Sequence, residues 1–226
     1  MRDITKLFGN YRLFQEKNGF RFSIDAVILS LFFPERKNKK ILEIGTGNGI
    51  IPIILLGKNK IDTITCVEIQ EKVSQLAIEN IKLNGFEKNV RVENCDIKKF
   101  KEGNSYDIII SNPPYMKIDG KKINVEESKS IARHEVCLTL EEFIENAKRL
   151  LKPRGEIYIV HQTSRLQDIL LLFEKNNFFP EKIQFAYHKK NTKSNLVLIK
   201  ALKGKKTILE VEEPLYMDEL NFELEE

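Results

Sequence analysis

The chain has 226 residues, of which 42% are hydrophobic and 31% charged, a composition typical of a folded domain rather than a disordered chain. Its longest apolar stretch, residues 50–56, is too short to cross a membrane, and the first residues lack the apolar segment of a signal peptide. Three widely spaced cysteines without a C-x-x-C pair, and three histidines without ligand spacing, favour neither a disulfide framework nor a metal site. We therefore expect a cytoplasmic protein without a resident metal.

The net charge of +4 is unevenly distributed. Residues 182–206 contain eight lysines and no acid, whereas residues 207–226 contain eight acids and no base, so the chain without this acidic tail carries +12. The basic segment suits a polyphosphate partner such as RNA, with Lys189, Lys190 and Lys193 as contacts. A solvated lysine-rich surface explains the charge equally well. For the tail we expect a frayed, solubilising end, with pairing to the basic segment as the alternative.

The predicted elements begin with a short helix between Ser23 and Pro34, within a helical lead-in of residues 1–38. Strands and helices then alternate. We predict strands over residues 40–44, 63–68, 90–94, 106–111 and 156–161, and helices over residues 50–56, 71–84, 139–151 and 166–175. Thr139 and Glu142 form a capping box at the start of the third of these helices.

Two further strands, near residues 183–187 and 195–201, are expected to pair antiparallel because no helix separates them. The pattern predicts one α/β domain over residues 1–226, with a mostly parallel seven-stranded sheet and helices on both faces. Residues 116–131 are polar and lysine-rich without a periodic pattern. A loop of that length in a compact domain is usually functional or disordered.

A glycine-rich turn follows the first predicted strand. It comprises Gly45, Thr46, Gly47, Asn48 and Gly49. Glycines permit a tight turn and let a ligand approach the backbone closely. A dinucleotide site would have the spacing G-x-G-x-x-G, which this turn lacks. Together with Glu43 before it, the turn fits the amino-acid part of S-adenosylmethionine better.

The ends of the next two strands supply further candidates for a cofactor site. Glu68, with Ile69 beside it, lies 19 residues beyond Gly49, where an acid accepts hydrogen bonds from both ribose hydroxyls of an adenosine. Asp96 and Ile97 follow the third strand and are placed to bind the adenine amino group and to cover its face. The alternative for Asp96 is a turn or cap residue.

The tetrapeptide Asn112-Pro113-Pro114-Tyr115 directly follows the fourth strand. In an open α/β sheet, ligands bind just beyond the carboxyl ends of the strands. The Asn112 side-chain oxygen and the Pro113 carbonyl can accept hydrogen bonds from an NH₂ group, which favours the pyramidal nitrogen of a methyl-transfer transition state. Tyr115 can stack on a flipped base. The alternative is a strand-to-loop turn in which Asn112 caps and Tyr115 packs.

The glycine turn preceded by Glu43 and followed by the tetrapeptide resembles the Rossmann-like, S-adenosylmethionine-dependent amino-methyltransferases. Segments 19–29, 132–135 and 138–143 further resemble the bacterial tRNA adenine-N(6) methyltransferases that modify the adenine beside the anticodon of valine tRNA. This resemblance covers nearly the whole chain. It implies a class I methyltransferase fold, tRNA as partner and a flipped adenine over the tetrapeptide.

The resemblance also implies that Ser23 and Asp25 lie near the cofactor and that Arg133 and His134 line the target site. A helix cap and a first-turn acid are the alternatives for the first pair. A local ion pair with Glu135 or another nearby acid is the alternative for Arg133.

Other substrates are compatible with the same tetrapeptide. Enzymes that methylate the glutamine of release factors carry a helical domain before the glycine turn, for which the 44 residues before Gly45 are too few. DNA and ribosomal RNA methyltransferases add recognition domains, and no insertion here is large enough for one. A non-catalytic RNA-binding module is the alternative of a different class, against which the intact turn and tetrapeptide argue. We expect a monomer.

Overall fold

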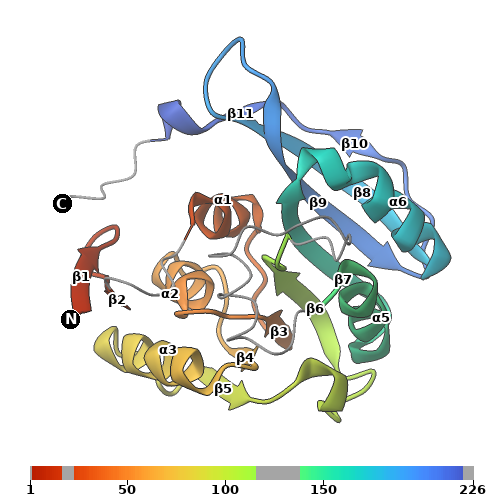
Figure 1. Ribbon diagram of the computed structural model, residues 1–226. Coiled ribbons are helices and arrows are strands. Elements are labelled where there is room, and N and C mark those ends of the chain that lie inside the picture. The colour runs from red at the N-terminus through yellow and green to blue at the C-terminus, as the bar shows by residue number, and fades with distance from the viewer. Residues whose placement is uncertain (1, 17–22, 116–137, 221–226) are drawn as a thin grey trace, which may run out of the picture.

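A mostly parallel sheet runs through the centre of the protein (Figure 1). The computed structural model describes residues 2–16, 23–115 and 138–220. Five strands pair in parallel in the spatial order β5 (Val90–Asn94), β4 (Ile64–Glu68), β3 (Ile41–Ile44), β6 (Tyr106–Ser111) and β7 (Leu151–Gln162). The sheet continues antiparallel through β9 (Ser194–Lys203) to β8 (Phe178–Tyr187). All seven predicted strands and the predicted antiparallel pair are therefore confirmed.

Helices cover both faces of this sheet (Figure 1). They are α1 (Ile24–Phe32), α2 (Ile50–Gly57), α3 (Glu71–Leu83), α5 (Leu140–Leu150) and α6 (Leu166–Lys175), with short 3₁₀ turns η1 (Ile97–Lys99), η2 (Thr163–Arg165) and η3 (Met217–Glu219). Side chains of the central strands alternate between two cores: Ile108 and Ile110 pack with α1 and α2, whereas Ile109 packs with α5 and α6. Burial on both faces explains why these strands read as continuous apolar runs.

The capping box predicted for α5 is present. Thr139 Oγ1 accepts a hydrogen bond from the Glu142 backbone N–H at 3.1 Å, and Glu142 Oε2 accepts one from the Thr139 backbone N–H at 2.9 Å. Both donors are groups that a helix N-terminus leaves without intrahelical partners. The helix therefore begins at the residue that local sequence chemistry indicates.

The lead-in differs from the prediction. A helix does lie at Ile24–Phe32, but an antiparallel hairpin of β1 (Arg2–Lys6) and β2 (Arg12–Glu16) precedes it and forms a separate two-stranded sheet. Two asparagines, one within α3 and one at its C-terminal end, form hydrogen bonds with the backbone of β2. Asn80 accepts from the Phe14 N–H at 2.7 Å, and Asn84 Nδ2 donates to the Arg12 carbonyl at 2.7 Å. The helical expectation for residues 2–16 is wrong because these partners come from far along the chain.

The acidic tail also differs from the frayed end that we expected. Two short segments, β10 (Glu210–Val211) and β11 (Leu215–Tyr216), pair in parallel with β8 and bring the sheet to nine strands instead of the predicted seven. Lys182 forms ion pairs with Glu210 and Glu212. The alternative prediction, pairing with the basic segment, is therefore what the structure shows for residues 207–220.

Among the described residues, no helix is long and apolar enough to cross a membrane. The same part of the chain contains no group of three or more histidine, cysteine or acidic side chains that could hold a metal ion.

Candidate active site

The candidate residues gather at one edge of the sheet, where β3, β4 and β6 end. Because these strands run parallel, their carboxyl ends meet at that edge. Gly45, Gly47 and Gly49 all have positive φ angles, of 75°, 59° and 83°. Side chains other than glycine rarely adopt that conformation, which is why the turn needs glycine at each of these positions. A Cβ built on Gly45 would meet no atom of the described residues within 4 Å, so these residues leave the space above it open.

Glu43 lies beneath this turn and is 1% exposed. Its Oε2 accepts hydrogen bonds from Thr46 Oγ1 at 2.5 Å and from Cys66 Sγ at 3.3 Å. Burial raises the pKa of Glu43 to about 7, although these two donors lower it. Among the described residues, Glu43 Oε1 has no hydrogen-bond partner.

Asn48 has the same deficit. Its side chain is fully buried, yet neither Oδ1 nor Nδ2 has a partner within the described part of the chain. A buried polar atom without a partner costs on the order of 1–3 kcal/mol, so native proteins rarely retain one without a compensating ligand or water. Three such atoms around the glycine turn indicate a site that a polar ligand completes.

Glu68 stands at the end of β4, as the sequence predicts, and ties the turn to this strand. Its Oε2 accepts from the Gly47 N–H at 3.0 Å and its Oε1 accepts from the Gln70 N–H at 3.0 Å. Ile69 beside it is 38% exposed at the same edge.

Asp96 and Ile97 follow β5 at this edge. Asp96 Oδ1 accepts from the Lys98 N–H at 2.9 Å and caps η1, which is the alternative that the sequence left open. Ile97 is 5% exposed and belongs to the core beneath α5 and α6. A role for Asp96 or Ile97 toward adenine stays a prediction.

The tetrapeptide is held in place by contacts across the site. Ser111 Oγ donates to the Ile44 carbonyl at 2.7 Å, which ties the end of β6 to the end of β3. The Tyr115 hydroxyl lies 2.8 Å from Asn112 Oδ1 and 2.5 Å from Asp25 Oδ2. The Tyr115 ring packs against His161 with ring centroids 4.7 Å apart. The amide oxygen that we predicted as acceptor for an amino group is therefore already in contact with a tyrosine hydroxyl.

Ser23 and Asp25 connect to the tetrapeptide. Asn112 Nδ2 donates to Ser23 Oγ at 3.4 Å, and Asp25 accepts from Tyr115. Ser23 is the N-cap residue of α1, although its side chain makes no capping bond, and Asp25 lies in the first turn, so both alternatives also hold by position. Both residues bring the start of α1 next to the end of β6.

His161 is a site residue that the sequence interpretation missed, because it was considered there only as a possible metal ligand. It is 1% exposed near the end of β7, and its Nδ1 accepts from the Gln162 N–H at 2.8 Å. Burial lowers the pKa of His161 to about 4, so the ring is neutral at physiological pH. Its place at the end of the next strand of the sheet was the signal that could have identified it.

The three predicted RNA contacts lie in the connection between β8 and β9. Because Leu196 pairs with Gln162 at the end of β7, this connection lies at the same sheet edge as the glycine turn. Lys190 Nζ pairs with Glu219 at 2.7 Å and lies 5.5 Å from the Tyr216 ring centroid. Lys189 and Lys193 are exposed. The predicted contacts Arg133 and His134, like the loop 116–131, lie outside the described residues.

Comparison of the sequence with known proteins identifies methyltransferases as its relatives. Residues 22–178 match the family model described as the methyltransferase small domain. A relative from Trichodesmium erythraeum named tRNA1(Val) (adenine(37)-N6)-methyltransferase is 31% identical over 169 residues, covering 71% of this chain and 70% of the relative. Relatives of the same name from Tolumonas auensis and Bacteroides fragilis are 29% and 27% identical, covering 85% and 94% of this chain and 80% and 92% of theirs.

Solved structures share the fold. A protein described as a predicted O-methyltransferase from Agrobacterium tumefaciens aligns with a TM-score of 0.66 at 18% identity, covering 85% of this chain and 87% of that one. TYW2 from M. jannaschii in complex with AdoMet aligns with a TM-score of 0.59 at 16% identity, covering 89% and 84%. The predicted Rossmann-like methyltransferase fold is therefore confirmed.

Proposed function

The chain belongs to the methyltransferase small domain family, and from this premise we propose that it methylates the 6-amino group of an adenine in tRNA. The position next to the anticodon of valine tRNA is the specific target, because relatives that align over most of the chain carry that activity in their names. The methyl donor is S-adenosylmethionine. We infer that the tRNA contacts the lysines in the connection between β8 and β9.

The observation that carries this proposal is the set of buried polar atoms at the glycine turn that have no partner among the described residues. Glu43 Oε1 and the Asn48 amide face no protein partner among the described residues, and they adjoin the glycine turn. An amino acid carries both a cation and an anion, so it can satisfy a carboxylate and an amide together. Glu68 stands at the adjoining strand end, where a carboxylate accepts hydrogen bonds from hydroxyl groups. These donors and acceptors fit S-adenosylmethionine without a metal.

When bound, S-adenosylmethionine supplies a methyl group on a positively charged sulfur. The protein has to hold the attacking nitrogen in line with that methyl group. The amino nitrogen of adenine is a weak nucleophile because its lone pair is delocalised into the ring. Asn112 Oδ1 and the Pro113 carbonyl would accept its two hydrogens and favour the pyramidal nitrogen of the transition state.

Tyr115 sets a condition for this step. Its hydroxyl has one hydrogen, which Asp25 Oδ2 at 2.5 Å and Asn112 Oδ1 at 2.8 Å share, so the hydroxyl competes with the adenine amino group for one of the two acceptor positions of the amide oxygen. Burial first, and then the Asp25 charge, raise the pKa of the Tyr115 hydroxyl, so it stays protonated. We propose that the Tyr115 hydroxyl gives up its hydrogen bond to the Asn112 amide oxygen when the adenine binds, and that the Tyr115 ring then stacks on the base.

The acidic tail bears on RNA affinity. Glu219 pairs with Lys190, and Glu212 pairs with Lys182, so the tail neutralises part of the basic segment. An RNA phosphate would have to compete with Glu219 for Lys190. Lys189 and Lys193 are exposed, form no ion pair with the residues that the structure describes, and are the more accessible contacts.

The test is transfer of radiolabelled methyl from S-adenosylmethionine to bulk tRNA from a strain that lacks the protein, followed by nucleoside analysis. We expect N(6)-methyladenosine in the anticodon loop of valine tRNA. Label on DNA, ribosomal RNA or protein glutamine alone would contradict the substrate. Failure to bind S-adenosylmethionine at millimolar concentration would contradict the enzyme and favour an RNA-binding module.

A further inference from the structure

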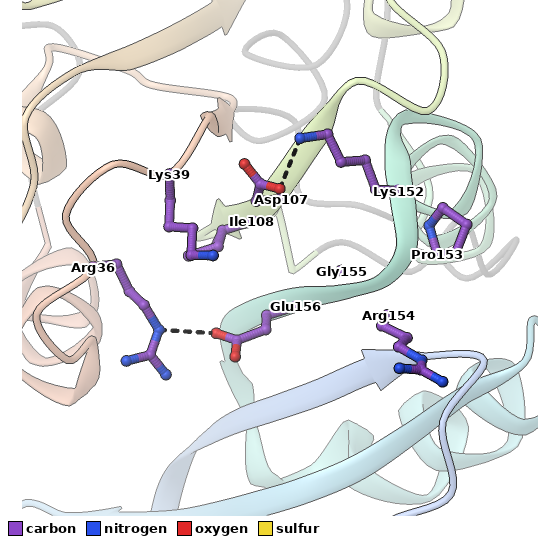
Figure 2. Close-up of a pocket in the computed structure, with 9 residues that line it drawn as sticks. All are labelled: Arg36, Lys39, Asp107, Ile108, Lys152, Pro153, Arg154, Gly155 and Glu156. Atoms are coloured by element: carbon purple, nitrogen blue, oxygen red, sulfur yellow. Dashed lines mark hydrogen bonds and ion pairs between the residues drawn. The ribbon is translucent and has the colours of Figure 1, made fainter.

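A cavity of about 140 Å³ lies at the opposite edge of the sheet, where β6 and β7 begin (Figure 2). It has room for several water molecules or one phosphoryl group. Four of its lining residues are cationic and two are carboxylates: Arg36, Lys39, Lys152, Arg154, Asp107 and Glu156. The methyl-transfer edge contributes none of them, so the cavity is a separate place in the fold.

Both carboxylates of the cavity are already neutralised. Asp107 Oδ1 accepts from Lys152 Nζ at 2.8 Å. Glu156 pairs with Arg36 at 3.2 Å and, on its other oxygen, with the buried Lys200 at 3.3 Å. Although burial opposes it, these cations help to hold the pKa of each carboxyl group below its usual value. The carboxylates therefore offer little charge to a further cation.

Lys39 and Arg154 are the two lining cations without a bonded partner, although the Lys39 charge also helps to lower the pKa of Asp107. Neither side chain has a hydrogen bond or an ion pair with any residue that the structure describes. Figure 2 shows Lys39 extending between the Arg36–Glu156 pair and the Lys152–Asp107 pair. Four cations against two neutralised carboxylates give the cavity a net charge of +2. A lining of this kind attracts an anion.

The backbone at Arg154 supports a role for its side chain. Its φ angle is 64°, in the left-handed region that is costly for any residue except glycine. Gly155 follows, and a Cβ there would lie 3.0 Å from the Lys152 carbonyl oxygen and 3.1 Å from that of Asp107. The tight turn thus explains Gly155. It does not explain an arginine at a position that glycine would occupy without strain.

We propose that this cavity binds a phosphoryl group, either on a small phosphate compound or in the backbone of an RNA. An arginine presents paired N–H donors that match phosphate oxygens, and a lysine adds a point charge. The Arg36 and Lys152 side chains, fixed by their carboxylate partners, complete the rim. The proposal does not depend on the methyl-transfer function assigned to the other edge.

The decisive variant is Arg154→Gly in the full-length protein. It removes the guanidinium and at the same time suits the positive φ angle, so we expect the Tm not to fall. Calorimetric titration with inorganic pyrophosphate at low ionic strength should show binding to the unmodified protein. We expect about tenfold weaker binding for Arg154→Gly and for Lys39→Gln, since each removes a charged donor. Lys88→Gln, a change at an exposed lysine of the α3–β5 connection, is the control and should leave binding unchanged.

A tRNA titration of the same variants distinguishes the two sources of the phosphoryl group. A loss of tRNA affinity with a salt slope lower by about one places an RNA phosphate in the cavity. Unchanged tRNA binding with lost pyrophosphate binding assigns the cavity to a small phosphate compound. The proposal is overturned if Arg154→Gly and Lys39→Gln match the unmodified protein in both titrations.

Discussion

Replacement of Tyr115 by phenylalanine tests how the tetrapeptide prepares its acceptor. The change removes the hydroxyl that lies 2.5 Å from Asp25 Oδ2 and 2.8 Å from Asn112 Oδ1, and it keeps the ring against His161. A hydrogen bond to a partly exposed carboxylate contributes about 1–2 kcal/mol to the free energy of unfolding. For a chain of this length that loss lowers the Tm by about 2–8 °C.

The expected effect on activity has the opposite sign. Without the hydroxyl, both acceptor positions of Asn112 Oδ1 are open to the adenine amino group, and no internal donor competes for them. Since such a bond is worth about 0.5–1.5 kcal/mol net, kcat/KM for tRNA should rise by about two- to tenfold. Tyr115→Ala also removes the stacking ring, which is worth about 1–3 kcal/mol per base, and should lower kcat/KM about 5- to 150-fold.

The assay is methyl transfer to valine tRNA at subsaturating concentration, with thermal unfolding of each variant measured alongside. Tyr158→Phe is the matched control. The Tyr158 hydroxyl donates to the Glu156 carboxylate at 2.7 Å, and this hydrogen bond lies outside the candidate active site. This variant should lower the Tm and leave kcat/KM unchanged. If Tyr115→Phe lost as much activity as Tyr115→Ala, the hydroxyl would be required for the reaction and the proposed exchange would be wrong.

Three further predictions concern the acceptor, the basic surface and the buried histidine. Asn112→Ala should abolish methylation with tRNA binding nearly intact; activity equal to that of the unmodified protein would rule out the acceptor role. Lys189→Gln combined with Lys193→Gln should weaken tRNA binding and lower the slope of its salt dependence by up to about two. Glu219→Gln removes the ion-pair partner of Lys190 and should strengthen tRNA binding. Unchanged slopes would exclude this surface as the RNA contact. Because the pKa of His161 is about 4 when folded against an ordinary 6.5, the unfolded chain takes up the proton first, and stability falls as the pH drops from about 6.5 to about 4. His161→Phe should remove that part of the fall, up to about 3 kcal/mol in urea unfolding, and an identical pH dependence in both proteins would refute the buried neutral state.

Local chemistry in the sequence was sufficient for the repeating part of the fold. Strands buried on both faces have to be apolar throughout, which made segments such as Tyr106–Ser111 recognisable. Helix starts such as Thr139 follow from hydrogen bonds between residues three apart. The glycine turn was recognisable because its positive φ angles exclude other residues. Since parallel strands end at one edge, the order of the motifs also predicted that Glu43, Glu68 and Asn112 would converge.

Contacts between residues far apart in the chain were decided only by the tertiary structure. The N-terminal hairpin depends on asparagine amides 66–72 residues away, and the tail depends on an edge strand about 30 residues before it. The bonds that join Tyr115 to Asp25 and pack it on His161 leave no periodic pattern, because each uses one side chain from a different element. The periodicity and spacing of residue types indicate only regular local structure, such as helices, strands and turns. A single long-range hydrogen bond or ring contact becomes visible only when the elements pack, because packing alone fixes which side chains can reach each other.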